Sequence, residues 1–379
     1  MSGRTLVITN DFPPRVGGIE SFVLEMTRRM PPDSVVVHTA RQTGDAEFDA
    51  GLAFPVVRDL SRIMLPTPAI TRRSVAIARK YECDSVWFGA AAPLGLMASA
   101  LKKRAGVRRT VATSHGHEVW WAMAPVTRQL LRRIGETNDV VTFLGEFTRS
   151  RIARALTPTA AARMVQLTPG VDTERFHPDV DGRPVRERYG LGDRLVIVCV
   201  SRLVKRKGQD MLIRALPLIQ REVPDAMVLL IGDGPDRGRL ERLAKSLRVG
   251  DKVVFAGSHP WEELPPFYAA GDVFCMPCRS RKFGFEAEAL GIVYLEASAI
   301  GLWVVAGDSG GAPDAICIGS TGSVVDGRSA ENIATAVTHR LLVFGSASRT
   351  EPEDQQWLGV SWRWDAMQVR LHHLLDASL

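Results

Sequence analysis

The sequence predicts an α/β fold of two doubly wound domains, each a parallel sheet covered by helices on both faces. Short apolar segments alternate with amphipathic helical segments along the whole chain, which is the pattern of parallel βα units. The chain has 379 residues, of which 45% are hydrophobic and 24% are charged, and this length favours two domains over one. A stretch rich in proline, glycine and charge interrupts the alternation at 167–179, as a linker does.

We therefore predict an N-terminal domain over 1–170 and a C-terminal domain over 171–359, with a cleft between them. In the N-terminal domain we expect a helix from Ile19 onward and strands at 6–9, 34–39, 84–88, 109–113, 139–142 and 163–167. In the C-terminal domain we expect strands in RLVIVCV, AMVLLIG, KVVFAG, DVFCMP and LWVVAG. The segment of about 360–379 is predicted to form an amphipathic helix that packs back on the N-terminal domain.

Cysteine content and hydropathy predict a cytoplasmic protein. Five scattered cysteines, an odd number, do not form a disulfide framework. Cys275 and Cys278 have the CxxC spacing, but no second pair completes a zinc site, so we interpret them as a strand end. The apolar start at 6–8 is too short for a signal peptide. The low-polarity run at 89–101 is shorter than the roughly 20 residues that span a bilayer.

Positive charge is concentrated in the first half of the chain. Residues 1–170 hold 23 Lys and Arg against 14 Asp and Glu, whereas the remainder holds 25 against 28. A helix at 71–81 would place Arg72, Arg73, Arg79 and Lys80 on one face. This face is either simply solvated or in contact with an anionic surface such as lipid headgroups. No nucleic-acid-binding signature accompanies it, so we expect no nucleic-acid partner.

Loops at the ends of the predicted strands contain the candidate ligand contacts. Gly17 and Gly18 lie between a strand and a helix, where backbone N–H groups can approach a phosphate, although a plain turn explains them as well. His115, in SHGHE, is either a capped loop residue or a hydrogen-bonding contact to a sugar. The chain contains neither GxGxxG nor a GxxxxGK[ST] phosphate loop, which removes the main support for an oxidoreductase.

The loop SRLVKRKGQD predicts a diphosphate site. Arg202 leaves the end of a strand and Lys207 stands where the next helix begins, so both cations can converge on an anion at a helix N-terminus. The alternative is a set of solvated surface cations. Lys205 and Arg206 are expected to be solvated in either case.

Glu288 and Glu296 are separated by seven residues in GFEAEALGIVYLEA, and by themselves they would be interpreted as a solvated pair on a helix. Together with the motifs described above, however, the chain resembles the retaining glycosyltransferases of the E-x7-E group, glycosyltransferase family 4. This family has the GT-B fold, two Rossmann-like domains facing each other across a cleft. The matching motifs, in the family's order, are Gly17-Gly18, His115, Arg202 with Lys207, Gly232-Asp233-Gly234-Pro235, Glu288 with Glu296, and Gly310-Gly311-Ala312-Pro313.

The resemblance implies a role for each of these residues. Glu288 would bind hydroxyls of the donor sugar and Glu296 the ribose. Arg202 and Lys207 would stabilise charge on the leaving diphosphate, and His115 would contact the sugar, so that His115, Glu288, Arg202 and Lys207 form the catalytic set. The base would be held by the backbone of Gly257, Ser258 and His259. Retention is expected without a protein nucleophile, and neither a cofactor nor a divalent metal is expected.

Three segments, 10–21, 114–122 and 285–297, resemble the actinobacterial mannosyltransferases of phosphatidylinositol mannoside synthesis. This resemblance implies GDP-mannose as the donor and phosphatidylinositol monomannoside as the acceptor, joined by an α-1,6 linkage. Asp11 and Trp120 are the candidate acceptor contacts. A peripheral location at the inner face of the cell membrane follows, and the basic first half of the chain agrees with it.

Two alternatives remain open at this point. One is a sister transferase that uses a UDP- or ADP-sugar and a soluble acceptor. The other is a protein that binds sugar nucleotides without transferring the sugar. The sequence predicts no particular oligomeric state.

Overall fold

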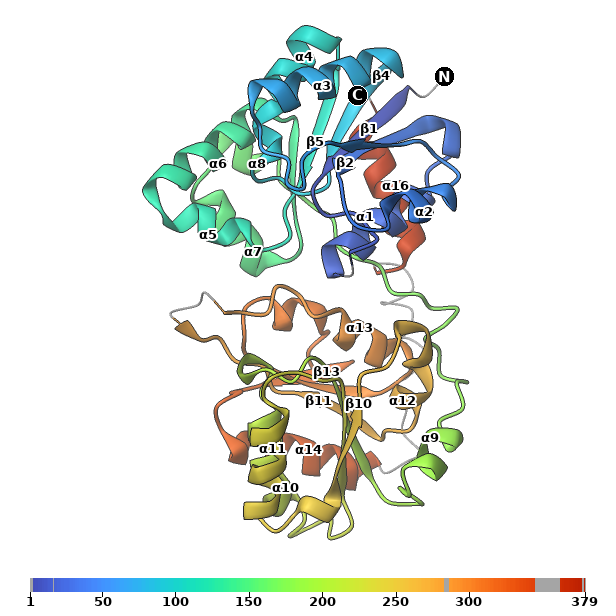
Figure 1. Cartoon of the computed structure of the whole chain (residues 1–379). Helices are drawn as coiled ribbons and strands as arrows, with labels where there is room; N and C mark the ends of the chain where they lie inside the picture. The colour runs from blue at the N-terminus through green and yellow to red at the C-terminus, as the bar shows by residue number, and fades with distance from the viewer. Residues whose placement is uncertain (1–2, 16, 283–285, 345–361, 377, 379) are drawn as a thin grey trace. The chain divides into compact units, whose positions relative to one another are not determined.

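A computed structural model describes residues 3–15, 17–282, 286–344, 362–376 and 378 of the chain. The chain divides into two compact units, one formed by Met1–Pro169 with Trp364–Leu379 and the other by Gly170–Arg363. Each unit is a parallel sheet with helices on both faces (Figure 1). The predicted fold class, two doubly wound α/β domains, is therefore confirmed.

The first unit is built on a seven-stranded sheet in the order β3-β2-β1-β4-β5-β6-β7. The strands are β1 (Arg4–Thr9), β2 (Val35–Ala40), β3 (Val56–Asp59), β4 (Cys83–Phe88), β5 (Arg109–Thr113), β6 (Val140–Phe143) and β7 (Val165–Gln166). Sequence analysis missed β3, because this four-residue edge strand is mostly half-buried and ends in Arg58 and Asp59. The reversal of strand order lies between β1 and β4, which is where open α/β sheets bind ligands.

Helices on the two faces of this sheet include one from the end of the chain. They are α1 (Gly18–Arg28), α2 (Asp45–Ala50), α3 (Pro68–Lys80), α4 (Ala98–Ala105), α5 (Glu118–Met123), α6 (Pro125–Thr137), α7 (Glu146–Ala153), α8 (Pro158–Ala162) and α16 (Trp364–Leu375). The start of α3 is fixed locally, since the Thr67 side chain accepts from the Ile70 N–H and Pro68 follows it. Helix α16 buries Met367 and Leu371 in the same cluster as side chains of α1.

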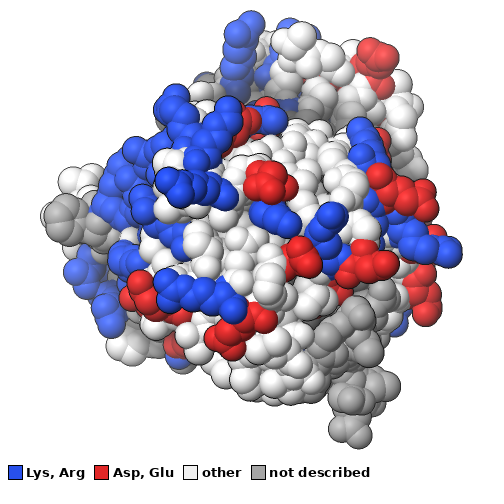
Figure 2. Space-filling model, turned by 90° about the horizontal axis from the view of Figure 1, so that it is seen from below, with Lys and Arg blue, Asp and Glu red and all other residues white. Residues whose placement is uncertain are grey.

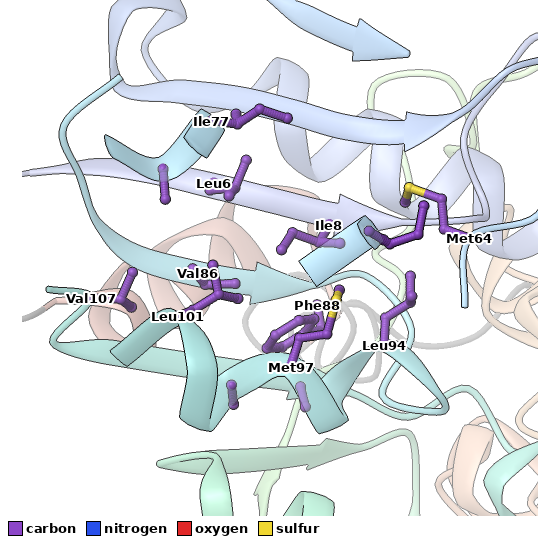
Figure 3. Close-up of a cluster of buried hydrophobic side chains, with 14 of the residues drawn as sticks. Leu6, Ile8, Met64, Ile77, Val86, Phe88, Leu94, Met97, Leu101 and Val107 are labelled. Atoms are coloured by element: carbon purple, nitrogen blue, oxygen red, sulfur yellow. The ribbon is translucent and has the colours of Figure 1, made fainter. Parts of the chain in front are cut away.

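Alternation along the strands divides the core between the two faces. Leu6 and Ile8 of β1 and Val86 and Phe88 of β4 point toward α3 and α4 in one buried cluster, which Figure 3 shows at close range. Trp87, which lies between Val86 and Phe88 in β4, points to the other face of the sheet. There it belongs to a second buried cluster, with Val7 and side chains of α1 and α16. This period of two is the expected pattern for a sheet covered on both sides.

The second unit repeats the plan with six strands in the order β10-β9-β8-β11-β12-β13. They are β8 (Val196–Val200), β9 (Met227–Ile231), β10 (Val253–Gly257), β11 (Val273–Met276), β12 (Trp303–Gly307) and β13 (Gly322–Val325). The helices are α9 (Arg183–Arg188), α10 (Gln209–Ile219), α11 (Arg237–Ser246), α12 (Pro265–Ala269), α13 (Ile292–Ala299) and α14 (Ala330–Phe344). The missed strand, β13, is again a short edge strand. Here the strand order reverses between β8 and β11.

Charged side chains are unevenly distributed over the surface. Figure 2 shows one face on which Lys and Arg gather along one side, while largely uncharged surface fills the centre. Among the described residues, no helix has both the length and the apolarity needed to cross a bilayer.

Candidate functional site

The cationic loop of the second unit lies directly after β8, at the reversal of strand order. Lys207 ends a 3₁₀ turn, Lys205–Lys207, and Gly208 caps α10 with a φ of +80°. A Cβ atom on Gly208 would lie 1.9 Å from the carbonyl oxygen of Pro277, so only glycine permits this close approach. Lys207 and the N-terminus of α10 therefore stand together, as the sequence predicted.

Glu288 is buried and ion-paired with this loop. Its Oε2 lies 2.7 Å from Lys207 Nζ and 2.7 Å from the Arg206 guanidinium. Burial by itself would raise the pKa of Glu288, but the two cations outweigh it and lower that pKa, so the group is a carboxylate at neutral pH. Its Oε1 accepts no hydrogen bond from the described residues, and it is therefore available to a ligand hydroxyl.

Arg206 corrects one expectation. Sequence analysis treated Arg206 as solvated, but its guanidinium pairs with Glu288. Arg202, by contrast, is exposed at the end of β8 and its side chain has no ionic or hydrogen-bonding partner among the described residues. The structure thus brings Lys207, Arg206 and Glu288 together and leaves the Arg202 side chain unengaged.

A pair of glycines holds the backbone of Glu288 in place. Gly311 N–H donates to the Glu288 carbonyl at 2.8 Å, and Glu288 N–H donates to Ser309 Oγ at 3.2 Å. A Cβ atom on Gly310 would lie 2.2 Å from the Glu288 carbonyl oxygen, and Gly310 has a φ of +59°. The Gly-Gly motif therefore fixes the loop that carries the first glutamate.

Glu296 lies in α13, eight residues further on, in a different electrostatic setting. Its Oε1 accepts from the Trp261 indole N–H at 2.8 Å and its Oε2 accepts from the Tyr268 hydroxyl at 2.6 Å. Burial raises the pKa of Glu296, and the hydrogen bonds from Tyr268 and Trp261 offset only part of that rise. Glu288 is thus neutralised by cations, whereas Glu296 is held by neutral donors.

The predicted base-binding loop follows β10. Gly257 has a φ of +83°, and its carbonyl accepts from Gly232 N–H at 2.7 Å. Ser258 is exposed, and the His259 ring packs on Phe267 with ring centroids 4.3 Å apart. The assignment of the base to this loop stays a prediction.

In the first unit, Gly17 and Gly18 begin α1 beside a small charged cluster. Arg15 donates to Asp11 Oδ1 at 2.7 Å and to Glu20 Oε1 at 2.5 Å. A Cβ atom on Gly17 would lie 2.2 Å from Glu20 Oε2, whereas Gly18 faces open space. Burial and the charge of Glu20 raise the pKa of Asp11, and Arg15 opposes this rise.

His115 follows β5 and lies beside a buried acid that sequence analysis missed. Its Nε2–H donates to the Gly89 carbonyl at 2.6 Å, and burial lowers its pKa, so the ring is neutral with Nδ1 as an acceptor. Glu118, fully buried, accepts from His115 N–H at 3.0 Å and lies 3.2 Å from His117 Nε2. The sequence signal that could have identified Glu118 was the HGHE motif, in which Glu118 follows His115 by three residues. Trp120 lies nearby and is 52% exposed.

Each set of residues has a recognisable chemistry. Buried carboxylates with free or exchangeable acceptor positions suit a ligand rich in hydroxyl groups, and a lysine at a helix N-terminus suits a phosphate. The second unit therefore fits a phosphorylated, polyhydroxylated ligand. The first unit offers a neutral histidine and a cluster containing Asp11.

Two family models match the chain, and each covers most of one unit. The model described as Glycosyltransferase Family 4 matches residues 16–175, and the model described as Glycosyl transferases group 1 matches residues 184–342. Together they include nearly all the candidate residues discussed above.

Curated relatives match at full length. A protein of Mycolicibacterium smegmatis, named GDP-mannose-dependent alpha-(1-6)-phosphatidylinositol monomannoside mannosyltransferase, is 50% identical over 98% of this chain and 98% of its own. A Corynebacterium glutamicum protein, named as the corresponding mannosyltransferase for the monoacylated lipid, is 40% identical over 99% of this chain and 98% of its own.

Solved structures share the fold at low identity. Anabaena HepE, crystallised with UDP, has a TM-score of 0.80 at 18% identity, covering 99% of this chain and 100% of its own. Sucrose-phosphate synthase from Thermosynechococcus elongatus has a TM-score of 0.75 at 20% identity, covering 98% of each chain.

Proposed function

The chain belongs to glycosyltransferase family 4, and we propose that it transfers mannose from GDP-mannose to the inositol ring of phosphatidylinositol monomannoside, forming an α-1,6 linkage. One observation carries this proposal. The 50% identity to a relative named for that reaction extends over 98% of both chains, so it includes both units. The product is the dimannoside of the same lipid.

In this proposal the second unit holds the donor. Lys207, Arg206 and Arg202 stabilise the negative charge that develops on the leaving diphosphate, and a well-placed donor of this kind contributes roughly 10²- to 10³-fold in rate. Glu288 binds a mannose hydroxyl through Oε1, since Oε2 already faces Lys207 and Arg206. Protein cations then meet the charge of the leaving group, and the proposal requires neither a divalent metal nor a cofactor.

Glu296 is proposed to bind the ribose hydroxyls. A carboxylate held by two neutral donors keeps full acceptor strength, because no cation competes for it. The leaving phosphate takes the proton of the acceptor hydroxyl on the same face of the sugar, which retains the configuration at C1. No side chain is assigned as a nucleophile.

The first unit is proposed to meet an anionic membrane surface on the cytoplasmic side. Helix α3 exposes Arg72, Arg79 and Lys80, although Arg73 is bound to Asp59. The loop between β3 and α3 exposes three large apolar side chains: Leu60 at 77%, Ile63 at 69% and Leu65 at 52%. Exposed apolar residues beside basic ones are typical of proteins that bind bilayer surfaces without crossing them.

A mass-resolved assay tests the proposed function. Purified protein is mixed with GDP-mannose and phosphatidylinositol monomannoside in vesicles, and the lipid is examined for one added hexose. Glu288→Gln serves as the matched inactive control. An added hexose that depends on GDP-mannose supports the proposal, whereas transfer only from a UDP- or ADP-sugar, or no transfer at all, contradicts it.

A further inference from the structure

A basic hollow in the first unit lies outside the residues assigned so far to catalysis. We call it the arginine pocket. It has a volume of about 420 Å³, and three arginines from three different loops line it. Its lining includes Arg15, Arg41 and Arg62, together with Asn10, Gln42 and Ile63.

The three loops follow the C-terminal ends of neighbouring strands. Arg15 follows β1, Arg41 comes directly after β2, and Arg62 lies three residues beyond β3. In a parallel sheet these ends meet at one edge, which is the edge where such folds bind ligands. The pocket therefore lies at the ligand-binding edge of the sheet, on the β3 side of the reversal in strand order.

Two side-chain amides join the loops to one another. Gln42 accepts from Arg15 N–H at 3.0 Å and donates to the Phe12 carbonyl at 2.8 Å. Asn10 donates to the Met64 carbonyl at 2.9 Å and accepts from Met64 N–H at 2.7 Å. These four bonds hold the three arginine-bearing loops in one arrangement before any ligand arrives.

The guanidinium groups are only partly neutralised. Arg15 is bound to Asp11 and Glu20, and Arg41 interacts electrostatically with the half-buried carboxylate of Asp45. The side chains of Arg41 and Arg62 donate no hydrogen bond to the described residues. The lining of the pocket thus includes two arginines whose side-chain donors are not used by any described residue.

We propose that the arginine pocket binds the phosphodiester of the acceptor headgroup. This inference rests on the proposed function, because it concerns the acceptor of that reaction. Guanidinium groups match phosphate oxygens in geometry as well as in charge. A surface that merely needed solvation would not require two amides to hold three loops around a hollow.

The position of the pocket predicts the orientation in which the acceptor binds. Arg15 links the pocket to Asp11, the candidate acceptor contact, through a 2.7 Å ion pair. Ile63 lines the pocket and belongs to the exposed apolar loop with Leu60 and Leu65. The acyl chains therefore lie toward that loop, the phosphate in the pocket, and the sugar ring on the Asp11 side.

Two soluble acceptors separate the contribution of the phosphate from that of the lipid. One is deacylated phosphatidylinositol monomannoside, which keeps the phosphodiester, and the other is mannosyl-inositol, which lacks it. Wild-type protein is expected to favour the phosphorylated acceptor in kcat/KM by roughly ten- to a hundredfold, the range for hydrogen bonds to a charged group. The double variant Arg41→Gln/Arg62→Gln is expected to lose most of this preference. Slow release of GDP from GDP-mannose without acceptor should not change.

The matched control is Lys103→Gln/Arg104→Gln on α4, which removes the same charge from the same unit and should keep the wild-type preference. If the pocket variant also keeps it, the proposal is overturned. If wild-type protein transfers neither to these acceptors nor to the monomannoside lipid in vesicles, the proposed function fails instead. Calorimetry with the deacylated monomannoside then tests this inference separately. Weaker binding by the pocket variant, with unchanged binding by the α4 control variant, supports the inference. Equal binding by the two variants overturns it.

Discussion

The indole N–H of Trp261 donates a 2.8 Å hydrogen bond to Oε1 of Glu296. Trp261 lies in a short 3₁₀ turn of the loop after β10, while Glu296 lies in α13, so this bond joins the predicted base-binding loop to the predicted ribose-binding carboxylate. The Tyr268 hydroxyl fixes the second oxygen. Both donors orient a buried carboxylate that has no cationic partner among the described residues.

Removing one of these donors should make Glu296 easier to protonate. Hydrogen bonds from Tyr268 and Trp261 lower the pKa of Glu296 against the rise caused by burial, so Tyr268→Phe should raise that pKa further. Ribose hydroxyls donate to the ionised form, so the acid limb of kcat/KM for GDP-mannose should move to higher pH. The pH profile of initial rates measures this shift.

Tyr294→Phe is the matched control for that experiment. Tyr294 is also buried, but its hydroxyl donates to the Met276 carbonyl at 2.8 Å rather than to a carboxylate. This variant should leave the position of the acid limb unchanged. Equal profiles for the two variants would rule out a positioning role for Tyr268.

Substitutions in the cationic loop after β8 should distinguish the roles of three neighbouring side chains, those of Lys205, Arg206 and Lys207. Lys207→Ala should lower kcat by roughly 10²- to 10³-fold, because it removes a cation from the leaving diphosphate. Arg206→Ala should also slow transfer, since Arg206 shares Glu288 with Lys207. Lys205→Ala, at an exposed position of the same turn, should retain activity. Steady-state rates of the three variants test this ranking of activity, and melting temperatures verify that each variant folds. A Lys205 variant as slow as the Lys207 variant would contradict the ranking.

Glu288→Gln should destabilise the protein in a pH-dependent manner. The cations lower the pKa of Glu288 below its ordinary value of 4.5 despite burial, so the carboxylate contributes stability above pH 4.5 that is lost as pH falls through the folded pKa. We expect a loss of about 1–3 kcal/mol at pH 7 that shrinks under acidic conditions. Urea unfolding of both proteins from pH 7 to pH 3 measures it. A difference that stays constant with pH would show that the ion pairs do not stabilise the fold.

His115→Ala should impair transfer without weakening GDP binding. His115 belongs to the first unit, whereas Lys207, Glu296 and the predicted base-binding loop belong to the second. We expect kcat to fall by roughly tenfold, the effect of losing one hydrogen bond to the sugar, with the Kd for GDP within twofold of the wild-type value. His117→Ala, which changes the exposed neighbour, is the control. A large rise in the GDP Kd for His115→Ala would assign this residue to nucleotide binding or to folding instead.

The apolar loop should contribute to membrane binding rather than to chemistry. Leu60→Ser/Leu65→Ser removes two exposed apolar side chains and should reduce co-sedimentation with vesicles that contain anionic phospholipid. Turnover of the deacylated acceptor should persist, because that substrate needs no bilayer. Val369→Ser, at an exposed position on α16, is the control. Unchanged vesicle binding of the loop variant would exclude this loop as the contact surface.

Much of the fold followed from local patterns. Buried strands such as β8 and β9 are continuous apolar runs, and turn residues separate them from the helices. Their positions can therefore be predicted from residues that are close together in the sequence. Short edge strands such as β3 and β13 lack that pattern, because part of each is open to solvent. Only pairing with an adjacent strand identifies them.

Local sequence patterns are enough to predict the fold class and the interval between Glu288 and Glu296, because a glycine turn, a helix start and a seven-residue spacing depend only on residues close together in the chain. Which side chains surround those two carboxylates depends instead on tertiary packing. Arg206 reaches Glu288 across 82 positions, and Trp261 reaches Glu296 across 35. Such partners are brought together by the packing of separate βα units, and no local pattern records that packing.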